Sequence, residues 1–477
     1  MVDLIAWLIF LAAAIILIAC LECLDLFILR RWRSSIRLPD PVAYTDVPSF
    51  AADSEIILRV HSTKPARVNF SRCGSAGFAP VHNTQVGAAK QNRLMHRWLG
   101  FNWQPSLALP PNTLTPGFYR IDIEHNDNPA NRWSMILVVS APAAQTRPIV
   151  VVASTNTWNA YNDFGGLSNY RDSATPPPLN LFRSLLMYFN LRPRVGDRHW
   201  LVAVPLPERR PNSAIHNDLI DTANRPSHLA REEAALIRFL ESEGARYNVI
   251  SDRHFAFSPP SSQTRLLIFN THSEYWSEEM IARLAECIRR GVSVAFLSGN
   301  NLFRKVQFLR DAISVIDRAT PPDQIVPLIG TYYDALGYMT YAPYRVVEPG
   351  HWCFAGLGLG EGSEFGAATA KHPAGSGYET DKLRFTAATA TSTAVPSAGD
   401  FRTLAIGKNP EGPAFMVCRD TGGGSFVFTA GSVAFAPCID DDPAIQQLVR
   451  NLVDRALQAV PSSAGVQNNA AAAGKDR

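Results

Sequence analysis

The chain has 477 residues, of which 46% are hydrophobic and 18% are charged, a composition that favours globular domains with buried cores over disorder. With 45 basic and 42 acidic residues the formal net charge is only +3, and no nucleic-acid-binding motif is present, so we expect no nucleic-acid partner. The seven cysteines are scattered and odd in number, which is not the pattern of a disulfide framework and favours a reducing compartment.

The N-terminus predicts a single-pass membrane anchor within residues 1–33. Residues 4–29 are mostly apolar, and a membrane-spanning helix needs about 20 such residues. Arg30, Arg31 and Arg33 follow this stretch, which predicts that the remaining domains face the cytoplasm. Export or lipoprotein processing is the alternative, because residues 17–20 resemble a lipoprotein cleavage box. No basic residue precedes the apolar stretch, which favours the anchor.

A linker at residues 34–52, with three prolines, leads to a region of short β-rich segments. Turn residues such as Pro116 and Gly117 separate these segments. We therefore predict a small β-sandwich domain at residues 53–145. The β-rich segments are 56–60, 67–70, 119–123 and 133–139.

Residues 146–460 predict an α/β domain, because continuous apolar strands alternate with amphipathic helices. Ser277 is a suitable N-cap for one of these helices, with Glu278 and Glu279 in its first turn. Residues 330–420 are rich in Gly, Ala and Thr and predict an insertion lobe over a parallel sheet. Residues 461–477 predict a disordered tail. The expected strands are 148–153, 248–250, 266–269, 292–297 and 425–429, and the expected helices end near 243, 290 and 460.

Polar and aromatic residues follow three of the predicted strands, in segments 155–170, 270–277 and 298–303. Functional sites of open α/β sheets form at the carboxyl ends of the strands, so we expect these segments to meet. Familiar hydrolase signatures are missing: the sequence has no G-x-S-x-G, no H-E-x-x-H and no Walker A motif. No cysteine follows a strand as a nucleophile would.

Several short motifs in these segments resemble one family. They are T-N-T-W-N-A-Y-N at 155–162, G-G-L-S-N-Y-R-D at 165–172, T-H-S-E-Y-W-S at 271–277, G-N at 299–300 and G-Y-E-T-D at 377–381. Together they resemble the large (beta) subunit of N,N-dimethylformamidase and its relatives, over about residues 148–458. The resemblance implies an α/β domain with a parallel sheet of the glutamine-amidotransferase-like type. A β/loop insertion would interrupt it. The small β-sandwich and the N-terminal transmembrane helix predicted above would precede it, and the apolar N-terminus is a departure from the amidase.

The resemblance also implies one ferric iron (Fe³⁺) per chain, bound by Tyr161, Tyr170 and Glu274. Phenolate and carboxylate are hard anionic donors, and only a strongly Lewis-acidic ion would keep tyrosine deprotonated at neutral pH. His272 and Asn300 would orient water or substrate.

A further implied residue is Glu379, which would act as general base or proton shuttle. The implied substrate is a small amide. The amidase pairs with a small subunit, and whether this chain does so, or forms a homo-oligomer, stays open.

Each of these residues also has a structural interpretation. The two tyrosines could anchor their loops, Glu274 could support the helix after Ser277, and His272, Asn300 and Glu379 could be a loop histidine, a turn residue and a surface residue. Three hypotheses therefore stand: an iron-dependent amide hydrolase, a non-catalytic binding protein on the same fold, and a hydrolase of another kind on a glutamine-amidotransferase-like fold. The stretch between the two tyrosine motifs is shorter here than in the amidase, so substrate identity does not transfer.

Overall fold

The computed structural model describes most of the chain. The described residues are 33–96, 99–166, 168–170, 206–223, 225–310, 312–317, 319–383 and 401–459, together with Trp7, Ile16 and Cys20. The predicted anchor at residues 4–29 lies outside them except for those three residues, and the predicted tail at 461–477 lies wholly outside them. No helix among the described residues is both long and apolar enough to span a membrane.

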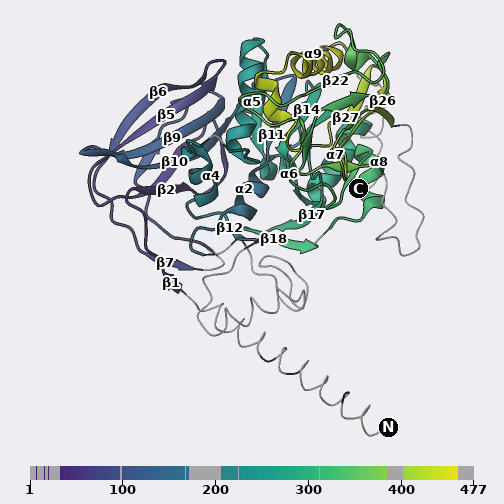
Figure 1. Cartoon of the computed structure of the whole chain (residues 1–477). Helices are drawn as coiled ribbons and strands as arrows, with labels where there is room; N and C mark the ends of the chain where they lie inside the picture. Colours follow the sequence, from purple (N-terminus) through teal and green to yellow (C-terminus); the bar gives the residue numbers. More distant parts are fainter. Residues whose placement is uncertain are drawn as a thin grey trace, which may run out of the picture.

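Residues 33–140 form two packed β-sheets at one end of the molecule (Figure 1). The alternating strands of both sheets send Val60, Phe70, Ile121 and Val139 into one shared core. The five-stranded sheet has the order β3 (Ser49–Ala51), β10 (Asn128–Ser140), β9 (Gly117–His125), β5 (Ala66–Gly74) and β6 (Gly77–Val86). The three-stranded sheet has the order β2 (Val42–Thr45), β4 (Ile56–His61) and β8 (Leu107–Leu109), and β1 (Arg33–Ser35) pairs with β7 (Leu94–His96).

A nine-stranded sheet forms the centre of the second part. Its order is β13 (Tyr247–Ser251), β11 (Ile149–Ala153), β14 (Leu266–His272), β16 (Ser293–Gly299), β27 (Ser425–Thr429), β26 (Phe415–Gly422), β25 (Arg402–Gly407), β21 (Tyr344–Val346) and β22 (Glu364–Phe365). The first five strands pair in parallel, in register, for example Ile268 opposite Ala295. They are buried on both faces, which explains their continuous apolar sequences.

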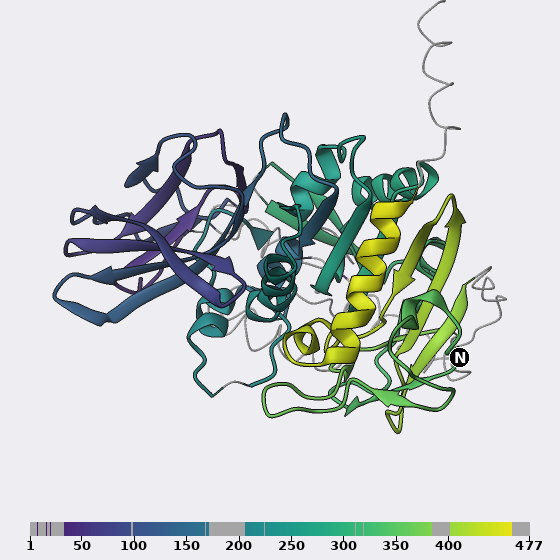
Figure 2. The same cartoon turned by 90° about the horizontal axis from the view of Figure 1, so that it is seen from above.

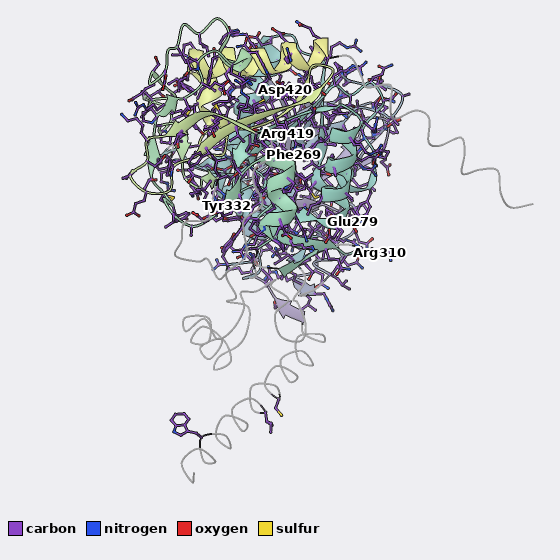
Figure 3. The ribbon with its side chains drawn as sticks, turned by 90° about the vertical axis from the view of Figure 1, so that its right-hand side faces the viewer. Phe269, Glu279, Arg310, Tyr332, Arg419 and Asp420 are labelled. Atoms are coloured by element: carbon purple, nitrogen blue, oxygen red, sulfur yellow. The ribbon has the colours of Figure 1, made fainter. Side chains whose placement is uncertain are left out.

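Helices cover both faces of this sheet. Because successive residues of each strand point to opposite sides, each strand contributes to two cores. In β14, Ile268 belongs to the core shared with α5 (Ala230–Ser242) and α9 (Pro443–Gln458). Its neighbour Phe269 belongs to the opposite core, with α6 (Asp252–Phe257), α7 (Glu278–Arg289) and α8 (Pro322–Ile329). Figure 2 shows α9, in yellow, beside the strands of the sheet, and Phe269, labelled in Figure 3, is fully buried.

The two parts of the chain share a core. Cys73, Phe118 and Val138 lie on the outer face of the five-stranded sheet and pack in the same cluster as α5. Arg72 of β5 donates to Glu241 of α5 at 2.7 Å, which adds an ion pair to this contact. The five-stranded sheet therefore packs against the second part where β5, β9 and β10 meet α5, while β6 remains largely exposed.

The predicted fold class is wrong in three respects. The central sheet is mixed, because β26, β25, β21 and β22 pair antiparallel with their neighbours. Those four strands come from residues 344–422, so the predicted insertion lobe instead extends the sheet itself. The predicted spanning helix has no counterpart among the described residues.

The turn after β26 explains why the sheet changes from parallel to antiparallel pairing at this point. Antiparallel strands need only a short connection, whereas parallel strands need a crossover. Gly422, Gly423 and Gly424 all have positive φ, at 96°, 61° and 88°, and connect β26 directly to β27. These three glycines, which lie just beyond the predicted lobe at 330–420, therefore build a hairpin that joins β26 to the parallel half of the sheet.

Smaller elements surround the carboxyl ends of the parallel strands. A four-stranded sheet has the order β12 (Leu206–Pro207), β18 (Ala312–Asp317), β17 (Arg304–Phe308) and β15 (Tyr275–Ser277). Two pairs join β19 (Tyr332–Tyr333) to β24 (Asp381–Lys382) and β20 (Tyr341–Ala342) to β23 (Ser376–Gly377). The remaining helices are α2 (Thr155–Tyr161), α4 (Ser213–Ile220) and the 3₁₀ turns η1 (Trp352–Phe354) and η2 (Ala436–Asp440).

Candidate functional site

The six residues singled out from the sequence lie in one cluster at the carboxyl edge of β11, β14 and β16, in which His272, Glu274, Asn300 and Glu379 are buried and Tyr170 is 38% exposed. Helix α2 follows β11 (Figure 1), Tyr161 is its last residue, and Tyr170 lies nine positions later. His272 is the last residue of β14 and Glu274 precedes β15. Asn300 follows β16, and Glu379 lies between β23 and β24.

Glu274 is 1% exposed and lies between the tyrosines and two cationic side chains. Arg304 donates from Nε to its Oε1 at 3.2 Å, and Nε2 of His272 lies 3.3 Å from its Oε2. The hydroxyl of Tyr170 lies 3.4 Å from both carboxylate oxygens, which is long for a hydrogen bond. The rings of Tyr161 and Tyr170 are 4.5 Å apart. Two phenols and one carboxylate therefore share one small volume.

The second carboxylate of the cluster is Glu379. Its Oε2 lies 2.9 Å from Nε2 of His272 and accepts from Nδ2 of Asn300 at 3.0 Å. Oδ1 of Asn300 is buried and has no hydrogen-bond partner among the described residues. The opposite orientation of the amide would turn its oxygen toward the carboxylate, so this orientation is the favourable one. The cluster therefore contains a carboxylate beside an unused buried acceptor.

His272 lies between the two carboxylates and a second histidine. Burial alone would lower the pKa of His272, but its hydrogen bonds to Glu274 and Glu379 and their charges outweigh burial and raise the pKa to about 10. Its Nδ1 lies 2.8 Å from Nδ1 of His228. Burial, followed by the charge of His272, lowers the pKa of His228 to about 3. The shared proton therefore stays on His272, which donates to His228.

Strained backbone holds several of these side chains in place. Thr271, Asn300 and Tyr378 have φ values of 54°, 52° and 66°, in the left-handed region that residues other than glycine rarely adopt. Asp381 accepts a hydrogen bond from the backbone N–H of Asn300 at 2.8 Å, which fixes that turn. Side-chain direction in this cluster is thus set by contacts between segments far apart in the chain.

A close backbone contact at Gly299 joins two of these segments. A Cβ added there would lie 2.5 Å from the backbone nitrogen of Val433 and 2.6 Å from the carbonyl oxygen of Glu379. We expect Gly299→Ala to lower the free energy of unfolding by about 1–3 kcal/mol, because backbone atoms must move to admit the methyl group. Urea denaturation measures this change.

The matched control for Gly299→Ala is Gly350→Ala, because a Cβ at Gly350 would meet nothing within 4 Å. We expect that variant to stay within about 0.5 kcal/mol of the parent. If the two variants had the same free energy of unfolding, the segment that carries Glu379 would be able to move and admit the methyl group without loss of stability.

The donor set fits the iron ion that the sequence motifs imply. Tyr161, Tyr170 and Glu274 offer hard oxygen donors that suit ferric iron. Burial, followed by the neighbouring Tyr170 and Glu274, raises the pKa of Tyr161 well above its usual value. The phenol therefore keeps its proton unless a strongly Lewis-acidic cation is bound beside it.

Four residues that contact the cluster were not predicted from the sequence. Arg304 begins β17, and His228 follows the segment after α4. The hydroxyl of Tyr275 lies 2.8 Å from that of Tyr170, and Tyr333 donates to Oε1 of Glu379 at 3.4 Å. No local pattern marks Arg304 or His228. Tyr275, in contrast, lies inside the T-H-S-E-Y-W-S motif and could have been singled out.

Comparison with known proteins identifies the family. The family model described as N,N-dimethylformamidase beta subunit-like, C-terminal, matches residues 67–447. The chain belongs to this family. The suspected resemblance is thereby confirmed, and it extends from the five-stranded sheet into α9. No curated protein matches the chain.

Solved structures add less, because the similarities are distant. A putative ThuA-like protein from Bacteroides uniformis matches with 10% identity and a TM-score of 0.31, covering 47% of this chain and 84% of its own. A ThuA-like protein from Parabacteroides merdae matches with 15% identity and a TM-score of 0.25, with the same coverage. A cycloisomaltooligosaccharide glucanotransferase from Paenibacillus matches with 13% identity and a TM-score of 0.15, covering 29% of this chain and 19% of its own.

Proposed function

We propose that this dimethylformamidase-like chain is a mononuclear-iron hydrolase that cleaves the C–N bond of a small amide. The observation that supports this most directly is the group of oxygen donors from Tyr161, Tyr170 and the buried Glu274, with His272 and Glu379 beside it. Two phenols and a carboxylate stabilise one another little at such close range unless they bind a cation. The family name describes a beta subunit, so we also propose that a smaller partner subunit completes the enzyme.

Bound iron would supply Lewis-acid chemistry, by polarising the amide carbonyl or lowering the pKa of a bound water. The chain's own residues then handle protons and orientation. The unused Oδ1 of Asn300 accepts an N–H or O–H from substrate or water. Glu379 takes a proton from the attacking water and returns it to the leaving nitrogen. Water adds to the carbonyl carbon, the C–N bond breaks, and a carboxylic acid and an amine leave.

His272 and Arg304 position the two carboxylates in this scheme. His272 bridges Glu274 and Glu379 through Nε2, so it holds the proposed ligand and the proposed base at a fixed separation. Arg304 fixes the Oε1 side of Glu274. The pair thus restricts both carboxylates to one geometry, which reduces the entropy lost on reaching the reactive arrangement.

Iron analysis and visible absorption of the purified full-length chain test the proposal. We expect about one iron per chain and a tyrosinate-to-iron charge-transfer band, because phenolate donates to ferric iron. Tyr161→Phe and Tyr170→Phe should each lose the band and most of the iron. Release of amine and acid from formamide, N-methylformamide and N,N-dimethylformamide measures the activity.

Tyr119→Phe is the matched control, because Tyr119 is a buried tyrosine of β9 outside the cluster. It should keep both iron and colour. A wild-type protein that stays colourless and iron-free after anaerobic loading with ferrous iron and reoxidation would refute the proposal. The domain would then be a binding protein on the same fold.

A further inference from the structure

A second group of metal-binding side chains lies outside the oxygen-rich cluster. His351 precedes η1, Cys353 lies within η1, and Cys418 lies on β26. One ligand atom from each lies within 4.8 Å of the others. The three side chains are almost inaccessible, at 4%, 0% and 0% exposure for His351, Cys353 and Cys418. A set of one imidazole and two thiols is softer than the donor set of the proposed iron site.

Contacts from three elements fix the position of this group. Asn451 of α9 donates from Nδ2 to the carbonyl oxygens of Cys353 and Ala355, both at 2.9 Å. Cys418 is held between β25 and β27, opposite Phe428 on the latter. Asp420, on the same strand as Cys418, lies 3.8 Å from Arg455 of α9, and Figure 3 shows it beside that helix. The group is therefore placed by packing and is not a chance meeting of flexible side chains.

The imidazole and the Cys353 thiol are both uncharged in this environment. Burial lowers the pKa of His351, so its ring stays neutral at physiological pH. Burial, followed by the hydrogen bond and charge of Cys418, raises the pKa of Cys353 well above its usual value. Nδ1 of His351 accepts only a long hydrogen bond, 3.3 Å, from the backbone N–H of Cys353. The Nδ1 lone pair of His351 is thus engaged only by a weak hydrogen bond and suits metal coordination.

We propose that His351, Cys353 and Cys418 bind one zinc ion, at a site separate from the oxygen-rich cluster. Zn²⁺ replaces the protons of the two thiols, so two protons leave and the buried group keeps zero net charge. Tetrahedral zinc with Zn–S bonds of about 2.3 Å places its ligand atoms about 3.8 Å apart, so only a small closure of the group is needed. Three protein ligands leave the fourth position for a water molecule.

Burial of the three side chains determines when a zinc ion would bind to them. The side chains are inaccessible in the folded protein, so zinc enters as the chain folds. Binding would tie η1 to β26 and α9, and would thereby stabilise the antiparallel half of the central sheet. The site would be structural even with its fourth position open, because its ligands are inaccessible to a substrate and belong to a hydrophobic core that also contains Phe354 and Phe426.

Metal analysis of the purified full-length chain tests the proposal, with iron and zinc measured separately. We expect about one zinc per chain in the parent protein. Cys353→Ser and Cys418→Ser should each lower the affinity for zinc at least about tenfold while iron is unchanged. Glu274→Gln should show the reverse, with iron lost and zinc kept. Failure of the iron proposal and failure of the zinc proposal are then distinguishable.

Two further measurements keep the test decisive if a serine variant does not fold. Cys287→Ala is the matched control, because Cys287 is buried on the inner face of α7, far from the proposed ligands in sequence. This variant should keep its zinc. Parent protein that is unfolded, stripped of metal and refolded with cobalt and reductant should give a thiolate charge-transfer band and visible bands of tetrahedral cobalt, and excess zinc present during refolding should prevent both. His351→Gln should weaken these bands.

Three results would overturn the proposal. The first is parent protein that takes up neither zinc nor cobalt when it is refolded with the metal under reducing conditions. The second is zinc retained in both serine variants. The third is a peptide map of the protein, prepared without reductant, that shows Cys353 and Cys418 joined by a disulfide. In that case the two thiols are oxidised by loss of two electrons and two protons, and they serve as a crosslink.

Discussion

Glu274→Gln should abolish iron binding and amide hydrolysis together. The substitution removes the only carboxylate of the proposed donor set, so the affinity for a ferric ion collapses. It also leaves the buried Arg304 without the negative charge now 3.2 Å away. Breaking a buried ion pair costs about 3–5 kcal/mol, so we expect the free energy of unfolding to fall by an amount of that order. Iron analysis and urea denaturation measure the two effects.

Glu279→Gln is the control for this variant. Glu279 lies in the exposed first turn of α7, only five positions along the chain, and Figure 3 shows it at the surface. We expect it to keep full iron, full activity and stability within about 0.5 kcal/mol of the parent. An iron-replete Glu274→Gln protein would show that the carboxylate is structural and would remove it from the proposed ligand set.

Glu379→Gln should separate catalysis from metal binding. Glu379 is not one of the proposed ligands, so iron content and the visible band should be unchanged. Loss of the proposed general base should lower kcat about 10²- to 10⁴-fold, with a smaller change in KM. Steady-state kinetics on the best amide of the series, together with iron analysis of the same preparation, measure both quantities.

The control for Glu379→Gln is Glu361→Gln, at an exposed position in the glycine-rich loop after η1. It should leave kcat and iron unchanged. If Glu379→Gln loses iron as completely as Glu274→Gln, Glu379 is a ligand and the base must be another group. If Glu379→Gln has normal kcat, the carboxylate serves only to hold His272.

Local sequence patterns predicted the elements that carry the proposed site. The apolar runs at 148–153, 266–269 and 292–297 correspond to β11, β14 and β16, and Ser277 caps α7 by accepting from the N–H of Met280 at 3.3 Å. These predictions succeed because burial on both faces and helix capping depend on residues close together in the chain. Positions after parallel strands meet at one edge of a sheet, which is why the predicted residues lie together.

The antiparallel half of the central sheet could not be predicted in the same way. β21 and β25 pair Tyr344 with Gly407, which are far apart in sequence and lie in short strands with no periodicity of their own. Their direction is decided by hydrogen bonds to distant partners, so a composition rich in Gly, Ala and Thr indicated only an inserted lobe at 330–420. The turn that makes the hairpin of β26 and β27 lies just beyond that region, at Gly422, Gly423 and Gly424.

By itself, the sequence determined the family of this protein, the strands and helices that build its parallel half and the motifs from which the proposed ligands come. Only the tertiary structure decided that Arg304 pairs with Glu274, that His228 lies 2.8 Å from His272, and that Cys418 meets His351 and Cys353. The physical reason is the separation along the chain between the residues that interact. Hydrophobic periodicity and capping are encoded in neighbouring residues, whereas ion pairs and ligand groups form between side chains that only the packing of distant segments brings together.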